Sequence, residues 1–176
     1  MKIKLCTLIA LALPVFAQTG IKAAMAKHWK ASGDLTIAVA KAMPAESYNF
    51  RPNPEEMNFG QLMAHIALAN VAACSRASGM ARPEVPAKIM AWNKDPNKID
   101  IDRDLAIQFL TDTFSFCSSA VNSLTPETLS ATVGPEGRQM SAFEVLWSYF
   151  THTAHHRGQA EVYLRVKGIK PPDYVF

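Results

Sequence analysis

Three of the chain's five histidines lie in the segment 152–159, which reads His-Thr-Ala-His-His-Arg-Gly-Gln. His152 and His156 are four residues apart, and on a helix this spacing places both imidazoles on one face, one turn apart. A third histidine, His65, lies in an earlier segment with helical periodicity. Two ligands from one helix and one from another would form a three-histidine site with an open coordination position, the arrangement of catalytic zinc-type sites. We therefore predict that His65, His152 and His156 bind a divalent metal ion.

Other polar residues near these histidines have a structural and a functional interpretation. His155 lies one residue off the shared face, and we assign it to helix packing or to an indirect contact with the site. Arg157 could stabilise an anionic substrate or pair with Glu161 four residues later, and we favour the pairing. Glu144 could act as a general base, but Ser141-x-x-Glu144 is also a capping-box pattern. The catalytic residues therefore stay unknown.

These residues must be positioned by helices, because four segments have helical periodicity and no segment reads convincingly as a strand. The segments span residues 19–42, 59–78, 103–124 and 141–167. Each carries an apolar stripe at helical spacing, and the main stripe of the last segment contains Phe143, Leu146, Trp147, Phe150 and Ala154. Asn58, Asp102 and Ser141 are suitable N-caps, and Gly79 and Gly168 follow the predicted ends of the second and fourth helices. We attribute a glycine inside the fourth helix, Gly158, to the close approach of another helix. The sequence predicts an all-α fold.

The connection 80–101 is much longer than the 2–8 residues usual between neighbours in a helical bundle. A crossover of this length allows the second and third helices to lie parallel, so we predict a four-helix bundle in up-down-down-up order. Cys74 lies 16 residues after Asn58, and Cys117 lies 15 after Asp102. In parallel helices these cysteines would lie at nearly the same height. A disulfide and two buried free thiols are both compatible with this arrangement.

The first residues resemble a secretory signal peptide, with Lys2 and Lys4 before an apolar run and with Val15 and Ala17 at a cleavage site. Cleavage near Ala17 would remove residues 1–17 and leave a single domain, residues 18–176, in the periplasm or outside the cell. Loss of the two lysines lowers the net charge from +3 to +1. Because this charge is close to neutral, we expect no nucleic-acid partner. The apolar run is too short to span a bilayer, so we expect no stable membrane insertion after cleavage. The sequence does not decide between a monomer and a homodimer.

Two parts of the sequence resemble DinB-like (DinB/YfiT) proteins. Segment 152–159, followed by Tyr163-Leu164-Arg165, Gly168 and Pro171-Pro172, is similar to the closing signature of that superfamily. The stretch from Phe50-Arg51-Pro52 through Phe59-Gly60-Gln61-Leu62 to His65 resembles its second-helix signature. The resemblance covers essentially the whole mature chain in the same order and spacing. It implies an up-down-down-up bundle in which His65, His152 and His156 hold a divalent metal.

The resemblance also limits the reactions to consider. Members of the family are described as metal-dependent hydrolases, or as transferases and isomerases that use low-molecular-weight thiols in the cytosol. Because export would separate this chain from such thiols, we favour a metal-dependent hydrolase with an unknown small-molecule substrate and a water at the open position. Zinc and nickel are the expected metals. The alternatives are a non-catalytic module that binds a metal or small ligand, and a thiol-dependent S-transferase.

Overall fold

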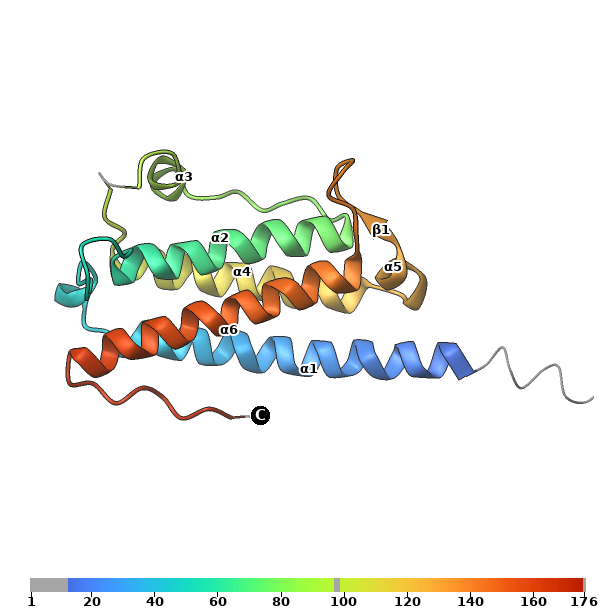
Figure 1. Ribbon diagram of the computed structural model, residues 1–176, viewed down its shortest axis with the longest axis horizontal. Coiled ribbons are helices and arrows are strands. Elements are labelled where there is room, and N and C mark those ends of the chain that lie inside the picture. The colour runs from blue at the N-terminus through green and yellow to red at the C-terminus, as the bar shows by residue number, and fades with distance from the viewer. Residues whose placement is uncertain (1–12, 97–98, 176) are drawn as a thin grey trace, which may run out of the picture.

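The computed structural model describes residues 13–96 and 99–175. Four long helices dominate this part of the chain (Figure 1): α1 (Leu13–Ala42), α2 (Phe59–Ser78), α4 (Arg103–Ser123) and α6 (Ala142–Val166). The all-α prediction is confirmed, although α1 begins before the predicted start at residue 19. The predicted signal peptide, residues 1–17, falls mostly outside the described residues. None of the described helices combines the length and the apolar character needed to cross a membrane.

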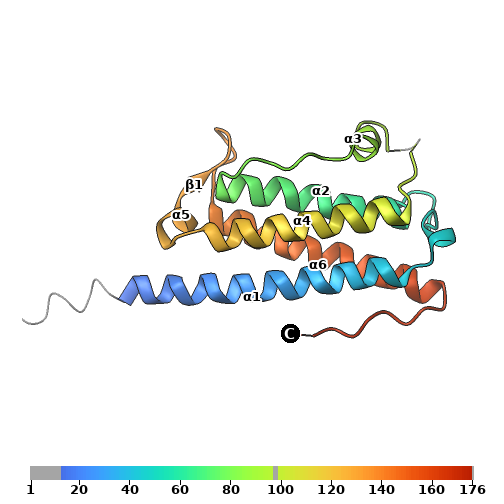
Figure 2. The same cartoon turned by 180° about the vertical axis from the view of Figure 1, so that it is seen from behind.

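The helices form a bundle in which α1 and α6 run in one direction and α2 and α4 in the other (Figures 1 and 2). At one end of the bundle, Arg103 Nε at the start of α4 donates to the carbonyl of Met43, just after α1, at 3.2 Å. At the other end, Lys22 Nζ in α1 donates to the carbonyl of Asn122 in α4 at 2.9 Å. These contacts fix α1 and α4 as antiparallel neighbours.

A disulfide joins the parallel helices α2 and α4. Cys74 and Cys117 are bonded, their Cα atoms lie 5.3 Å apart, and both residues are fully buried. The structure therefore excludes the alternative of two free thiols. The equal heights expected from the two N-caps are also observed, because only a matched register brings these positions opposite each other.

Polar side chains at the start of α2 secure the end of the crossover. Asn58 and Gln61 form a capping box, in which Gln61 N donates to Asn58 Oδ1 at 2.9 Å and Asn58 N donates to Gln61 Oε1 at 3.0 Å. Gln61 Nε2 also donates to the carbonyls of Pro96 and Ile99, at 2.9 and 3.0 Å. The cap that begins the helix carrying His65 therefore also anchors the returning chain.

Short elements occur in connections where the sequence predicted only loops. The crossover contains α3 (Ala87–Lys94), which buries Ile89 and Trp92. The connection before α6 contains α5 (Pro126–Ser130) and the antiparallel strands β1 (Thr132–Val133) and β2 (Met140–Ser141), and a 3₁₀ turn, η1 (Ala45–Ser47), follows α1. Strands of two residues are too short to give an alternating pattern, so the prediction of no strand is wrong here for a physical reason.

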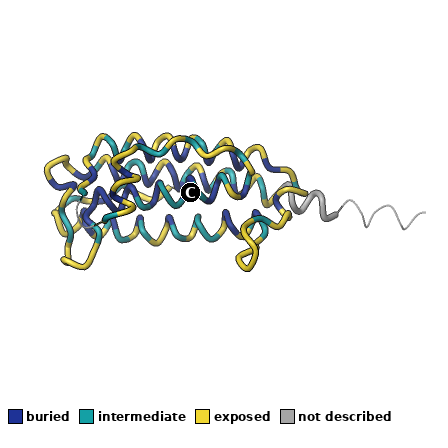
Figure 3. Tube along the Cα trace, turned by 90° about the horizontal axis from the view of Figure 1, so that it is seen from above, coloured by how far each residue is buried: buried dark blue, intermediate teal, exposed yellow. Residues whose placement is uncertain are grey.

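The core lies where the inner faces of the four long helices meet, and buried residues alternate with exposed residues within the turns of each helix (Figure 3). The predicted apolar stripes of α1, α2 and α4 are buried. For α6 the prediction is partly wrong, because Trp147 is 53% exposed and Ala154 is also exposed. Leu146 of the predicted stripe is buried, and the rest of the buried face of α6 includes Ala160 and Leu164.

Candidate metal centre

The structure brings the three predicted histidines together between α2 and α6. His65 Nε2 lies 3.1 Å from His152 Nε2 and 3.2 Å from His156 Nε2. Three ring nitrogens, one from each histidine, all lie within 4.8 Å of one another. All three residues are only partly buried, so the cluster adjoins solvent rather than lying in the closed core.

Burial keeps these imidazoles neutral. Loss of solvation lowers the pKa of His65, and repulsion from a charged His156 lowers it further. The same two causes lower the pKa of His152 to about 4. Burial also lowers the pKa of His156, although its hydrogen bond to Gln159 and the charge of Glu56 act in the opposite direction. Neutral imidazoles at neutral pH present the lone pairs that a metal ion requires.

Gln159 orients one of the three rings. Its Oε1 lies 2.6 Å from His156 Nδ1, and because an amide oxygen only accepts, Nδ1 must carry the hydrogen. The lone pair of His156 is then on Nε2, the nitrogen that faces the other histidines. Nδ1 of His152 is buried and has no hydrogen-bond partner among the described residues. The i,i+3 spacing of His156 and Gln159 is the signal in the sequence that could have revealed this pair.

The remaining candidates lie outside the triad. His155 is exposed, and its ring contacts the His156 ring with centroids 4.8 Å apart. Glu144 caps α6, since its carboxylate accepts from the backbone N of Ser141 at 2.8 Å. This capping contact explains Glu144 without a role as a general base.

Arg157 faces α1 rather than the histidines. Its Nη1 donates to Ser32 Oγ at 2.9 Å, its Nε lies 3.9 Å from a carboxylate oxygen of Glu161, and its guanidinium lies 5.5 Å from the Tyr174 ring centroid. The pairing with Glu161 that we favoured is present. For Gly158 the expectation is wrong, because an added Cβ would have no neighbour within 4 Å, so no helix approaches closely there.

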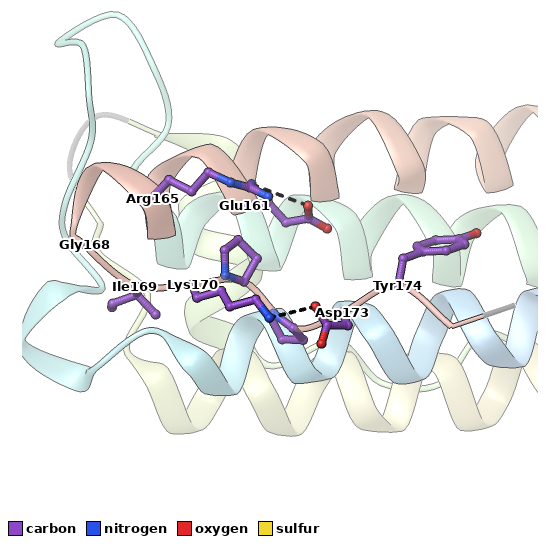
Figure 4. A pocket seen from close by; sticks show the side chains of 9 residues that line it. Glu161, Arg165, Gly168, Ile169, Lys170, Asp173 and Tyr174 are labelled. Carbon is purple, nitrogen blue, oxygen red and sulfur yellow. Dashed lines mark ion pairs between the residues drawn. The ribbon is translucent and has the colours of Figure 1, made fainter.

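Two cavities lie on parts of the surface that the triad does not line. A cavity of about 540 Å³ lies between the end of α6 and the segment that follows it (Figure 4), where Arg165 pairs with Glu161 at 3.7 Å and Lys170 pairs with Asp173 at 3.0 Å. A second cavity, of about 390 Å³, lies between α1 and α6 and is mostly apolar, with His28 and Trp147 in its wall. Among the described residues, no cluster of metal-binding groups lines either cavity.

The geometry of the triad fits a metal ion. Metal–nitrogen distances of about 2.0–2.1 Å in a tetrahedral site separate the nitrogen ligands by about 3.3 Å, close to the two observed separations. The ligands are all imidazoles, which suit zinc, nickel, copper and iron alike. The triad could therefore hold a metal ion, and its ligand chemistry does not select which one.

The comparisons with known proteins agree on one family. The sequence model of the DinB superfamily matches residues 28–160. A crystal structure of a DinB-like protein from Bacillus cereus is similar with a TM-score of 0.70 at 20% identity, over 86% of this chain and 95% of that one. A DinB-like protein from Bacillus subtilis gives a TM-score of 0.67 at 18% identity, over 85% and 96%. At these identities the two structures support the fold alone, and no curated protein matches the sequence significantly.

Proposed function

The chain belongs to the DinB superfamily, and on this premise we propose that it is a metal-dependent hydrolase of a small molecule, with His65, His152 and His156 as the metal ligands. The observation that carries the proposal is the convergence of three Nε2 atoms from two helices, at separations of 3.1 and 3.2 Å. Such spacing would be unfavourable for three lone pairs unless a cation or a proton lay between them.

The partial exposure of the triad supports catalysis rather than a purely structural site. A structural zinc site usually has four protein ligands, whereas a catalytic site has three and leaves a position for water or substrate. Among the described residues, the group of metal-binding side chains contains three histidines and no carboxylate or thiolate. A bound ion would act there as a Lewis acid that activates water or polarises a carbonyl group.

The residues of the chain would supply orientation and charge control. Gln159 would hold the ring of His156 with Nε2 directed at the ion. The low pKa values of the three histidines would keep the ligands unprotonated at neutral pH. Zinc and nickel remain the metals that we propose.

We also propose that the protein acts in the periplasm or outside the cell. The proposal depends on the N-terminal pattern of a signal peptide, and the Cys74–Cys117 disulfide supports it, because disulfides persist mainly in oxidising compartments. An oxidising location would make the use of a low-molecular-weight thiol less suitable for this chain.

Metal analysis of purified protein tests the proposal. The wild-type protein should contain about one divalent ion per chain, and His156→Ala should lose it because two ligands rarely hold such an ion. His155→Ala is a matched control, since His155 is the adjacent, exposed histidine on the same helix. Equal metal content in His156→Ala and wild-type protein would refute the proposed site.

A second measurement separates a hydrolase from a binding module. Exchangeable water on the bound ion, together with metal-dependent hydrolysis of a panel of ester, amide and phosphoester substrates, would support catalysis. A coordination shell closed by a fourth protein ligand would instead favour the non-catalytic module.

A further inference from the structure

A hydrogen-bonded bridge joins α2 and α6 next to the histidines. Asn70 Nδ2 in α2 donates to Thr153 Oγ1 in α6 at 2.8 Å, and also to the carbonyl of Ile66 at 2.8 Å. Thr153 Oγ1 in turn donates to the carbonyl of Tyr149 at 2.9 Å. The bridge therefore runs without interruption from the backbone of α2 to the backbone of α6.

The ends of the bridge lie in the turns that carry the histidines. Ile66 directly follows His65, and Tyr149 precedes His152 by three residues, on the same helix. The bridge thus joins the carbonyl of one ligand-bearing turn to the carbonyl of the other. A change in the separation of α2 and α6 at this level would break at least one of its hydrogen bonds.

Burial makes this bridge a strong constraint. Asn70 is 0% exposed and Thr153 is 1% exposed, whereas the three histidines are partly exposed. The bridge therefore lies on the inner side of the contact between α2 and α6, and the triad lies nearer to solvent. Water cannot readily replace a lost partner inside the core, so breaking the bridge would leave buried polar groups unpaired.

We infer that Asn70 and Thr153 are positioning residues, whose bridge holds α2 and α6 at the separation that brings the three Nε2 atoms together. The inference depends on the proposed function, because it assigns the bridge to the metal centre. To bind the ion, all three Nε2 atoms must be unprotonated, and three lone pairs that face one another repel, so the helices need an attachment that opposes their separation. A binding site that is held ready in this way binds its ligand more tightly than one that must first be assembled.

Replacement of the hydroxyl tests the inference. Thr153→Val keeps the shape of the side chain and removes both hydrogen bonds of the hydroxyl, whereas Thr153→Ser retains the hydroxyl. Thr36→Val is a matched control in α1, because Thr36 is 0% exposed and its hydroxyl donates only within its own helix, to the carbonyl of Ser32 at 2.7 Å. Asn70→Leu breaks the same bridge from α2 and replaces Thr153→Val in the test if that variant does not fold.

Titration of metal-free protein with Co²⁺ measures the effect, through the dissociation constant and the visible absorption of the bound ion. We expect Thr153→Val to weaken Co²⁺ binding by about tenfold or more and to weaken the absorption bands of tetrahedral Co²⁺. Thr153→Ser should restore both properties, and Thr36→Val should bind as the wild type does. A purely structural role would lower the unfolding temperature of the metal-free protein without changing either property of the bound ion.

The outcomes separate the inference from its premise. If the wild-type protein binds Co²⁺ and a folded bridge variant binds it with the same affinity and spectrum, the inference is wrong and the metal centre stands. Wild-type protein that binds neither Co²⁺ nor Zn²⁺ would overturn the metal centre itself, and the positioning role with it.

Discussion

Gln159 determines which nitrogen of His156 is available to a metal. Its amide oxygen accepts from Nδ1, whereas the corresponding nitrogen of His152 has no partner among the described residues. The two histidines of α6 therefore differ in how firmly their rings are held, although their spacing in the sequence makes them appear equivalent. Side chains that orient a metal-binding histidine commonly affect metal affinity almost as much as the ligands do.

Removal of this orienting contact should weaken metal binding without unfolding the protein. We expect Gln159→Leu to raise the dissociation constant for Zn²⁺ by about 10–100-fold, because the His156 ring is then free to rotate. Competition with a chromophoric chelator measures the constant. Gln108→Leu is the control, since Gln108 is an exposed glutamine of α4 that donates to Asp112, away from the triad. Unchanged affinity in Gln159→Leu would show that the contact does not orient the ring.

Two helical glycines, Gly60 and Gly158, differ in the space that surrounds them. At Gly60, in the first turn of α2, a Cβ would collide with the carbonyl oxygen of Ile101, where the crossover returns to the bundle. At Gly158, within α6, a Cβ would meet nothing within 4 Å and the residue is exposed. The close approach of another helix that was expected at Gly158 is absent, whereas at Gly60 the backbone of the crossover approaches closely.

Alanine substitutions at these positions should have opposite effects on stability. Gly60→Ala must displace backbone of the crossover and should cost about 2 kcal/mol or more of unfolding free energy. Gly158→Ala should stabilise the protein by about 0.5–1 kcal/mol, because glycine is unfavourable in an exposed helix interior. Urea denaturation of the two variants and the wild type measures both changes. Destabilisation by Gly158→Ala would indicate a contact that the structure lacks.

At the scale of the whole molecule, the disulfide links helices that a long crossover separates in sequence. Cys74 and Cys117 are 43 residues apart, and the bond closes a loop that contains the whole crossover and α3. Cross-linking restricts the unfolded chain, and loops of this length give the larger stabilisations. The same bond holds α2, which carries His65, against α4.

Loss of the disulfide should lower the stability of the folded protein. We expect the double variant Cys74→Ala with Cys117→Ala to lose about 2–4 kcal/mol of unfolding free energy relative to the oxidised wild type. Urea denaturation measures the difference, and a reductant should not alter the stability of the variant. If the variant and the oxidised wild type unfold at the same urea concentration, the bond does not stabilise this fold.

Local patterns in the sequence were sufficient to predict the four long helices, the N-caps Asn58, Asp102 and Ser141, and the three histidines that come together. Helical periodicity and capping depend on neighbours a few residues away, so one chain segment contains the information they require. The same reasoning explains the buried stripes of α1, α2 and α4.

Contacts between distant segments were decided only by the tertiary structure. Periodicity shows which side chains of α6 share a face, but not which helix covers that face, so Trp147 is exposed and Arg157 faces α1. Folding likewise brings together the segments that give Asn70 its partners and that bury α3 on the bundle. It also decides between a disulfide and two thiols. The sequence by itself determined which residues could form a metal centre, and the packing of α2 against α6 decided that their nitrogens meet.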